Sequence, residues 1–233
     1  MKEYQSIVIL TGAGISAESG IQTFRAADGL WENHRVEDVA TPEAFVRDPE
    51  LAHRFYNARR QYLLNGIKPN AAHAAIANFS KAHPDRLTLV TQNIDNLHQQ
   101  AGNDLIYPMH GELLKIRCKI TGQLFDCNHQ VSPQDQCPCC QTKGNLRPHV
   151  VWFGEMPLYM NDIEQALRQC DLFISIGTSG NVYPAAGFFQ TAKYYGAHTV
   201  ELNLEASASG SLFDEQHYGP ATQIVPKFFN SLR

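Results

Sequence analysis

The sequence lacks a long apolar run and an excess of positive charge. No stretch of the 233 residues approaches the roughly 20 consecutive apolar residues that cross a bilayer. Met1–Gln5 leads directly into a strand-like run, without the apolar core of a signal peptide. The formal net charge of −4 argues against generic attraction to nucleic acid or anionic lipid. We therefore expect a cytoplasmic protein with no membrane association and no specific nucleic-acid partner.

Cysteine is scarce and clustered. Of six cysteines, four lie between positions 127 and 140, and all but Cys170 lie between 118 and 140. A chain of this length buries roughly 70–75% of its unfolded surface and needs no disulfide support for its core. In a reducing compartment, such clustering indicates a metal site more than disulfides.

Apolar runs too continuous for a half-exposed strand alternate with segments of helical pattern. Strands separated by helices form a parallel sheet with helices on both faces, so the predicted fold class is α/β with a Rossmann-like core. The predicted strands are Ser6–Thr11, Leu87–Thr91, Leu105–Tyr107, Leu172–Ile176 and Thr199–Leu202, and the predicted helices are His73–His83, Asn161–Gln169 and Ala185–Tyr195.

Two regions break this alternation. Residues 38–67 read as helices, because Thr41-Pro42 and Asp48-Pro49 each resemble an N-cap followed by proline at the first helical position. Residues 113–148 are turn-rich and hold the cysteines. Neither region builds a core alone, so we expect both to form one small domain beside a nucleotide-binding domain of residues 1–37, 68–112 and 149–233. A cleft between two such lobes is a common ligand site.

Gly12-x-Gly14-x-x-Ala17 follows the first strand and fits the dinucleotide fingerprint. The alternative is a tight strand-to-helix turn. A dehydrogenase would continue into a second strand ending in an acidic residue. Instead Ile21–Trp31 resembles a loop that offers a cation, an aromatic ring and glycine. This departure counts against hydride transfer.

A polar segment, Thr91–His98, and the pair His110-Gly111 each follow a predicted strand. Taken singly, Asn93, Asp95 and His110 have ordinary explanations as turn or hydrogen-bonding residues. Together they lie where open α/β sheets bind ligands, at the carboxyl ends of parallel strands. Histidine titrates near neutral pH and suits removal of a proton from a sugar hydroxyl.

Five motifs occur in order along nearly the whole chain: Gly12-Ala13-Gly14-Ile15-Ser16, Thr91-Gln92-Asn93-Ile94-Asp95, His110-Gly111, Gly177-Thr178-Ser179 and Asn203-Leu204-Glu205. Together they resemble the sirtuins, NAD-dependent protein lysine deacylases, and most closely the bacterial class III members. The resemblance implies NAD as co-substrate, acylated-lysine proteins as partners, and nicotinamide and O-acyl-ADP-ribose as products.

The resemblance also implies roles for individual residues. His110 would be the general base, with Asn93 and Asp95 as further catalytic residues. The residues implied to bind NAD are Gly12, Ala13, Gly14, Ile15, Phe24, Arg25, Gln92, Asn93, Ile94, Asp95, Gly177, Thr178, Ser179, Asn203, Leu204, Glu205 and Ala221.

Tyr56 and Arg59 share one face of the predicted helix Pro49–Leu64. From spacing alone, an exposed basic helix surface is the favoured reading. The resemblance reverses this, because Tyr-x-x-Arg is similar to the acyl-pocket pair of class III sirtuins, and Ala40 is similar to the small residue that widens that pocket. A guanidinium grips a carboxylate through parallel hydrogen bonds, so the pair implies succinyl- and malonyl-lysine as substrates, with some deacetylation retained.

A second segment resembles the family's substrate-flanking strand, Val151-Trp152-Phe153-Gly154-Glu155, with Val182 opposite. An extended peptide held between them would form an added strand. Core packing of Trp152 and Phe153 is the equally weighted alternative. The implied substrate contacts are Val151, Phe153, Gly154, Glu155 and Val182.

Sirtuins usually hold a structural zinc with two C-x-x-C pairs, and zinc prefers four tetrahedral ligands in such sites. Here the second pair is present in Cys137-Pro138-Cys139-Cys140, but Thr121 replaces a cysteine in the first. We expect Cys118, Cys137 and Cys140 as ligands and Cys127 as the fourth, with Cys139 and His129 as other candidates. Packing of this lobe without a metal remains an alternative.

Other functions stay open at this point. A dehydrogenase on a related fold would produce NADH. A nucleotide sensor or zinc-ribbon interaction module would have no turnover, which the position of His110 speaks against. An NAD glycohydrolase or ADP-ribosyltransferase would use the same bond cleavage with another acceptor, so only its products distinguish it from a deacylase.

Overall fold

The computed structural model describes residues 3–22, 30–31 and 34–232. Its central sheet has six parallel strands in the order β11-β10-β9-β1-β4-β5. β1 lies in the middle because the chain first builds β4 and β5 on one side and later returns to place β9 on the other. The strands are β1 (Ile7–Thr11), β4 (Leu87–Thr91), β5 (Ile106–Pro108), β9 (Leu172–Ile176), β10 (His198–Asn203) and β11 (Glu215–Tyr218).

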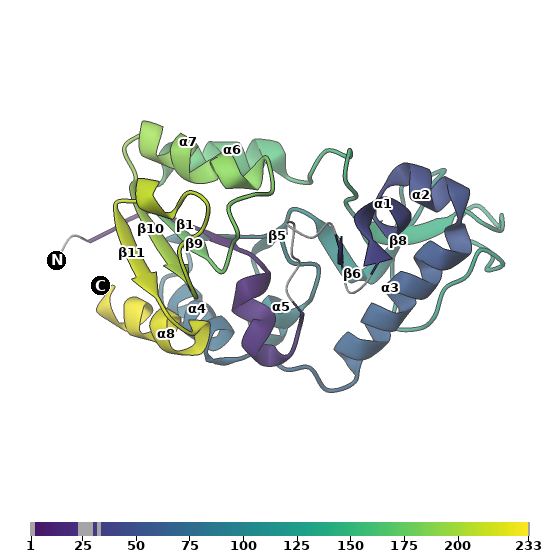
Figure 1. The fold of residues 1–233 in the computed structure, drawn as a ribbon, viewed down its shortest axis with the longest axis horizontal. Coiled ribbons are helices and arrows are strands. Elements are labelled where there is room, and N and C mark those ends of the chain that lie inside the picture. Colours follow the sequence, from purple (N-terminus) through teal and green to yellow (C-terminus); the bar gives the residue numbers. More distant parts are fainter. Residues whose placement is uncertain (1–2, 23–29, 32–33, 233) are drawn as a thin grey trace.

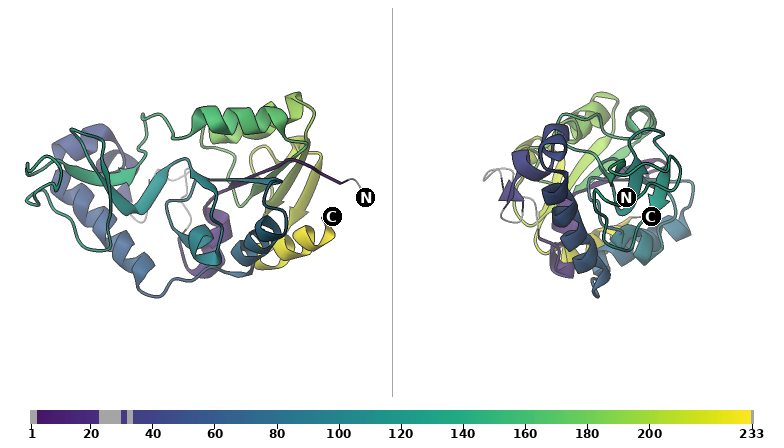
Figure 2. Two further views of the ribbon diagram at one scale, coloured as in Figure 1. Left: turned by 180° about the vertical axis from the view of Figure 1, so that it is seen from behind. Right: turned by 90° about the vertical axis from the view of Figure 1, so that its right-hand side faces the viewer.

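Helices cover both faces of this sheet (Figure 1; Figure 2). Ile7 and Ile9 of β1 pack in one core cluster with α4 (Ala71–Ala82) and α8 (Ala221–Ser231). Val8 and Leu10 point the other way, into a cluster with α6 (Met160–Gln169) and α7 (Phe188–Tyr194). The predicted Rossmann-like α/β class is therefore confirmed.

Short elements complete the large lobe. They are the 3₁₀ helices η1 (Ala13–Ser19), η3 (Ala185–Gly187) and η4 (Gly210–Leu212), and α5 (Leu97–Ala101). Among the helices that the structure describes, none combines the length and apolar character needed to span a membrane.

The small lobe combines the two regions that interrupt the alternation (Figure 1). Its helices are α1 (Val36–Val39), α2 (Pro42–Arg47) and α3 (Pro49–Leu64). The Thr41 and Asp48 side chains accept hydrogen bonds from the amides of Ala44 (3.1 Å) and Leu51 (2.8 Å), so both predicted N-caps are confirmed. Its strands are β6 (Gly111–Cys118), β7 (Leu124–Asp126) and β8 (Leu146–Val150), antiparallel in the order β7-β6-β8, with a two-stranded pair of β2 (Leu30–Trp31) and β3 (His34–Arg35) beside them.

Helix α3 joins the two inserted regions. On one side Phe55 packs with Val150 and other residues of β6 and β8 in a shared core. On the other, Asn57 exchanges two hydrogen bonds with the backbone of Val131, at 2.8 and 3.0 Å. Arg60 is buried and donates to the carbonyls of Leu113 (3.1 Å) and His129 (3.2 Å). The helix is thus fixed to the cysteine-bearing segment.

Candidate active site

A cavity of about 830 Å³ is lined by residues of both lobes. On the large-lobe side it is reached by the segments that follow β1, β4, β9 and β10, which all end at one edge of the parallel sheet. On the small-lobe side it is lined by α3 and by the chain after β8. This is the edge where open α/β sheets bind ligands.

The glycine loop after β1 packs against the loop after β9. The Gly14 amide donates to the Gly177 carbonyl at 2.9 Å. A Cβ atom on Gly14 would lie 2.7 Å from the Gly177 Cα, and one on Gly12 would lie 2.8 Å from the Gly177 oxygen. These glycines are therefore required for backbone-to-backbone packing, which brings Gly12, Ala13 and Gly14 to the cavity wall beside Gly177.

The far end of the cavity on the large lobe carries the other residues expected at NAD. Ile15 is fully buried in the core and does not line the cavity. Phe24 and Arg25 lie outside the described residues. The Asn203 side chain donates to the Thr178 carbonyl at 2.8 Å, which joins the loops after β9 and β10. The lining here includes Thr178, Ser179, Asn203, Leu204, Glu205 and Ala221.

His110 lines the cavity and lies just after β5. Its Nδ1 lies 3.0 Å from the Gln92 carbonyl oxygen, and because a carbonyl only accepts, Nδ1 carries the proton. Burial lowers the pKa of His110, and the bond to Gln92 offsets part of that effect. The ring is then neutral near pH 7, with Nε2 as a proton acceptor.

Asn93 and Asp95 share one hydrogen-bond network with Ser16 below the cavity. The Asn93 amide donates to the Ser16 hydroxyl (3.2 Å) and to the Gly12 carbonyl (3.2 Å). Ser16 in turn donates to Asp95 at 3.0 Å. Burial raises the pKa of Asp95, and hydrogen bonds from the Leu97 amide and from Ser16 oppose the rise. The predicted trio of His110, Asn93 and Asp95 thus lines one cavity, together with Gln92 and Ile94.

Two buried histidines, His73 and His98, lie next to this network. Neither of them was predicted to have a role, although His98 ends the polar segment Thr91–His98. The rings of His73 and His98 lie 4.9 Å apart, centroid to centroid. His73 approaches the Ser16 hydroxyl at 3.4 Å, and His98 approaches the Thr11 hydroxyl at 3.0 Å. Burial lowers the pKa of His73 to about 4 and that of His98 to about 3. The sequence offers one hint of His73, because it is a polar residue among the buried apolar residues of α4.

The small-lobe end of the cavity is lined by Ala40, Tyr56 and Arg59. Tyr56 is fully buried and Arg59 is 8% exposed, so the alternative of an exposed basic helix surface is wrong for these two residues. The Arg59 guanidinium lies 3.1 Å from the Phe55 ring centroid and donates to the Phe55 carbonyl at 2.8 Å. A cation buried at a cavity wall favours an anionic ligand group.

The segment after β8 divides into a buried and an exposed part. Trp152 is 3% exposed and packs in the small-lobe core, whereas Phe153 is 48% exposed at the cavity mouth. The alternative that these rings pack in the core is therefore confirmed for Trp152 and wrong for Phe153. The Glu155 carboxylate binds Arg147 at 2.6 and 3.0 Å. Val151, Gly154, Glu155 and, from the opposite side, Val182 also line the cavity.

Four cysteines gather in the small lobe: Cys118, Cys137, Cys139 and Cys140, with all sulfurs within 4.8 Å of one another. Cys127, which we expected as the fourth ligand, is not among them, and the structure brings Cys139 into the group instead. The Cys127 thiol instead donates to the His129 carbonyl at 3.4 Å. The Cys139 sulfur lies 3.2 Å from the hydroxyl of Thr121, the residue that replaces the second cysteine of the first C-x-x-C pair.

These cysteines fit a tetrahedral zinc ion. Bonds of about 2.3 Å put neighbouring sulfurs about 3.8 Å apart, and the Cys118–Cys140 and Cys137–Cys139 separations are 3.7 and 3.4 Å. Hydrogen bonds from Thr121 lower the pKa of Cys118 to about 6, which favours the thiolate that binds metal. Four protein ligands leave no open position for catalysis at such an ion.

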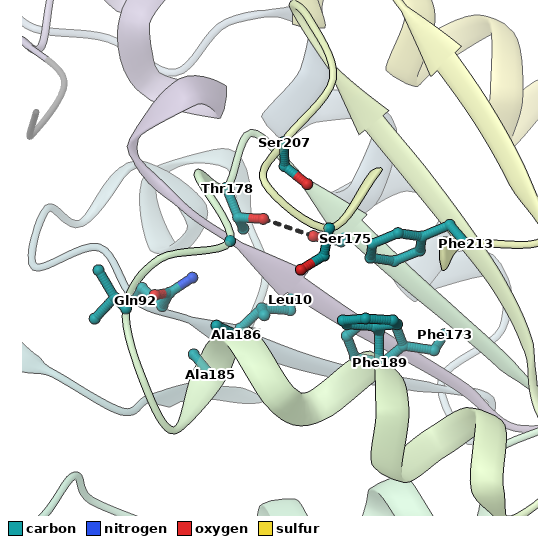
Figure 3. A pocket seen from close by; sticks show the side chains of 13 residues that line it. Leu10, Gln92, Phe173, Ser175, Thr178, Ala185, Ala186, Phe189, Ser207 and Phe213 are labelled. Carbon is teal, nitrogen blue, oxygen red and sulfur yellow. Dashed lines mark hydrogen bonds between the residues drawn. The ribbon is translucent and has the colours of Figure 1, made fainter. Parts of the chain in front are cut away.

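A second cavity, of about 20 Å³, adjoins the large one and shares Gln92, Thr178, Val182 and Ser207 with it. The Ser175 and Thr178 hydroxyls lie 2.8 Å apart on its wall, with the rings of Phe173, Phe189 and Phe213 close by (Figure 3). Its volume suits a single water molecule. It therefore adjoins the large-lobe side of the large cavity rather than forming a separate site.

A Rossmann-like sheet whose glycine loop lines an interlobe cavity beside a buried histidine is typical of enzymes that bind a dinucleotide. A model described as the Sir2 family matches residues 12–184. The chain belongs to the Sir2 family, which confirms the predicted resemblance to the sirtuins.

Curated relatives are similar over nearly the full length of this chain. A protein from Salmonella typhimurium called NAD-dependent protein deacylase is 65% identical over 229 residues, covering 98% of this chain and 84% of that protein. Proteins of the same name from Escherichia coli (strain K12) and Pasteurella multocida are 63% and 60% identical, and cover 99% and 98% of this chain and 83% and 98% of their own lengths.

Solved structures extend the similarity to the fold. A Sir2 homologue in complex with NAD matches with a TM-score of 0.88 and 35% identity, over 98% of this chain and 89% of that one. A Sir2 protein with a deacetylated p53 peptide and 3′-O-acetyl-ADP-ribose matches with a TM-score of 0.83 and 25% identity, over 98% of this chain and 94% of that one.

Proposed function

We propose that this chain removes acyl groups from lysine side chains of proteins, with NAD as co-substrate, and that it prefers acyl groups ending in a carboxylate. Nicotinamide and an O-acyl-ADP-ribose are the products. The observation that carries the proposal is a single cavity that is lined by His110, by the glycine loop after β1 and by the buried pair Tyr56 and Arg59.

The dinucleotide occupies the large-lobe side in this proposal. The loops at Gly12–Gly14 and Gly177–Ser179 take the phosphates and adenosine, with Asn203 and Glu205 nearby. Asn93 and Asp95 line the region expected for nicotinamide. Holding both substrates in register supplies much of the rate, because it removes the entropic part of the barrier.

His110 acts as the general base. The acyl-lysine oxygen attacks the anomeric carbon of the ribose as nicotinamide leaves. Removal of a ribose hydroxyl proton by the Nε2 atom of His110 then lets the 2′-oxygen add to the acyl carbon. The lysine amine leaves that carbon with a proton, and a water molecule adds in its place, which gives O-acyl-ADP-ribose. The hydrogen bond from Nδ1 to Gln92 supports this role, because it fixes the tautomer in which Nε2 accepts a proton.

The preference for a terminal carboxylate follows from the small-lobe end. Tyr56 and Arg59 can each donate to a carboxylate, and the small Ala40 leaves room beside them. Succinyl- and malonyl-lysine carry such a group, whereas acetyl-lysine does not. Charge-assisted contacts of this kind contribute roughly 1.5–3 kcal/mol, which corresponds to about one to two decades in preference.

The four cysteines would hold one structural zinc ion. When bound, it would fasten the turn-rich segment of the small lobe and supply no reactive water, because its four positions are filled by protein. The chain's own part is to present thiolates and to hold α3 against the same segment through Asn57 and Arg60.

The test is mass spectrometry of the products formed from NAD and a succinyl-lysine peptide. The proposal expects free lysine peptide, nicotinamide and O-succinyl-ADP-ribose in equal amounts. Free ADP-ribose with an unchanged peptide would identify a glycohydrolase, ADP-ribosylated peptide a transferase, and NADH a dehydrogenase. Each of these results would contradict the proposal.

A further inference from the structure

The phenol of Tyr56 is held by a tryptophan behind it. The Trp152 Nε1 donates a hydrogen bond to the Tyr56 oxygen at 2.8 Å. Tyr56 is 0% exposed and Trp152 is 3% exposed. An indole N–H can only donate, so the Tyr56 oxygen is the acceptor in this bond. The bond therefore sets the direction in which the phenol presents its own proton.

Trp152 is itself fixed by the ion pair of Arg147 and Glu155, of which Glu155 lines the cavity and Arg147 does not. The Arg147 guanidinium lies 3.3 Å from the Trp152 ring centroid. Glu155 binds that guanidinium through two hydrogen bonds, at 2.6 and 3.0 Å, and accepts a third from the Trp152 backbone amide at 2.8 Å. Ring, backbone and counter-ion are thus held by one connected set of contacts.

The same group leaves a positive charge behind the acyl end of the cavity. Arg117 also donates to Glu155, at 3.2 Å. Burial raises the pKa of Glu155, but the hydrogen bonds from Arg147 and the Trp152 amide and the nearby Arg117 outweigh it and leave the pKa below its ordinary value. Two guanidinium groups therefore share one carboxylate, and the surplus charge adds to that of Arg59.

We propose that Trp152 and Arg147 are specificity-determining positioning residues, which act through the Tyr56 hydroxyl to favour an acyl group that ends in a carboxylate. The inference rests on the proposed function, since it explains how the pair Tyr56 and Arg59 is kept ready for an anion. Arg147 acts without touching the acyl group, because Trp152 lies between it and Tyr56. Their loss should therefore lower the preference between acyl groups and leave the chemistry intact.

The experiment compares Trp152→Phe with the wild type on succinyl- and acetyl-lysine peptides of one sequence at saturating NAD. Phenylalanine keeps an aromatic ring and removes the N–H. We expect kcat/KM for the succinyl peptide to fall about tenfold, as for one lost hydrogen bond to a charge-binding group. The fall lies in KM, and the value for the acetyl peptide changes less than twofold.

A double-mutant cycle tests the route of the effect. If Trp152 acts through the phenol, Trp152→Phe adds no further loss of preference in a Tyr56→Phe background. Arg147→Lys keeps the charge and loses the planar stack and the paired hydrogen bonds. It should lower the succinyl preference less than Arg147→Met, which removes the charge as well.

Phe45→Leu is the matched control, because the Phe45 ring packs 5.1 Å from that of Trp152 and makes no bond to Tyr56. It should lower the melting temperature and affect both peptides equally. An equal loss on both peptides in Trp152→Phe as well would reduce Trp152 to a packing residue and overturn this inference alone. A wild type that does not favour the succinyl peptide overturns the acyl preference itself, and this inference with it.

Discussion

His110 and Gln92 are joined by a hydrogen bond from the imidazole Nδ1 to the main-chain carbonyl, 3.0 Å long. The carbonyl belongs to the segment after β4, and the imidazole to the segment after β5, the neighbouring strand. Pairing of these two strands therefore orients the proposed base. No second side chain is needed to select its tautomer.

The first prediction concerns His110 and pH. Because burial lowers its pKa below the ordinary 6.5, the ring is deprotonated and active at neutral pH and becomes protonated only under acid conditions. We expect kcat/KM to stay level above pH 6.5 and to fall about tenfold per pH unit once the pH is below that pKa. His110→Ala should keep NAD binding, measured by calorimetry, and lose turnover.

The matched control for this prediction is His217→Gln on the edge strand β11, whose side chain is exposed. Its pH profile should coincide with that of the wild type. Near-normal turnover in His110→Ala would remove this residue from the mechanism.

The second prediction concerns Arg59. We expect Arg59→Met to lower the ratio of kcat/KM for succinyl over acetyl peptides by about one to two decades, because it removes the charged partner of the carboxylate. Arg54→Met is the control on the same helix: the Arg54 side chain is 65% exposed and pairs with Glu50 on the surface. An unchanged ratio in Arg59→Met would place the acyl-binding group elsewhere.

The third prediction concerns zinc. Protein washed with a weak chelator should contain one zinc ion per chain by metal analysis, and Cys139→Ala should lose it, because three thiolates bind zinc far more weakly than four. Cys127→Ala should keep it, since this thiol bonds to the His129 carbonyl. The opposite result for the two variants would restore Cys127 as the ligand.

The fourth prediction concerns acid stability. His73 and His98 have pKa values lowered to about 4 and about 3 by burial. Each is neutral when folded and binds a proton more readily when unfolded, so the folded state loses stability as the pH falls from about 6.5 towards these values. At pH 4 the loss for His73 amounts to about 3 kcal/mol by this linkage.

Urea unfolding at pH 7 and pH 4.5 measures how the free energy of unfolding changes with pH. His73→Asn should reduce the difference in unfolding free energy between the two pH values, whereas His34→Gln, at an exposed position, should leave it unchanged. A slope that persists in both His73→Asn and His98→Asn would assign the acid sensitivity to other groups.

The buried strands could be predicted because each consists of a continuous run of apolar residues, which can be recognised in the sequence. β4 and β9 begin and end where the runs do. β5 lies one residue later than predicted, since Leu105 is 77% exposed. The last strand and helix were missed: β11 has no apolar run and is largely exposed, and α8 carries Pro226 in its interior. Helix α8 is stabilised by its packing against α4, a tertiary contact that cannot be read from the local sequence.

The site was predictable where a motif carries its own geometry. The glycine loop, the Thr91–Asp95 segment and His110 all reach one cavity because strand ends share an edge of the sheet. The identity of the fourth cysteine in the group was not predictable, because order along the chain does not reveal which thiol lies beside the other three. The contact of His73 with His98 likewise depends on how α4 and α5 pack.

The division of the cavity between the two lobes has an evolutionary consequence. The groups proposed to face the acyl tail, Ala40, Tyr56 and Arg59, all belong to the small lobe, whereas the loops proposed to bind the dinucleotide belong to the large lobe. Substitutions in one lobe can therefore retune which modification is erased without disturbing how the co-substrate is consumed. A single scaffold of this kind can diversify its choice of substrates while its chemistry stays constant.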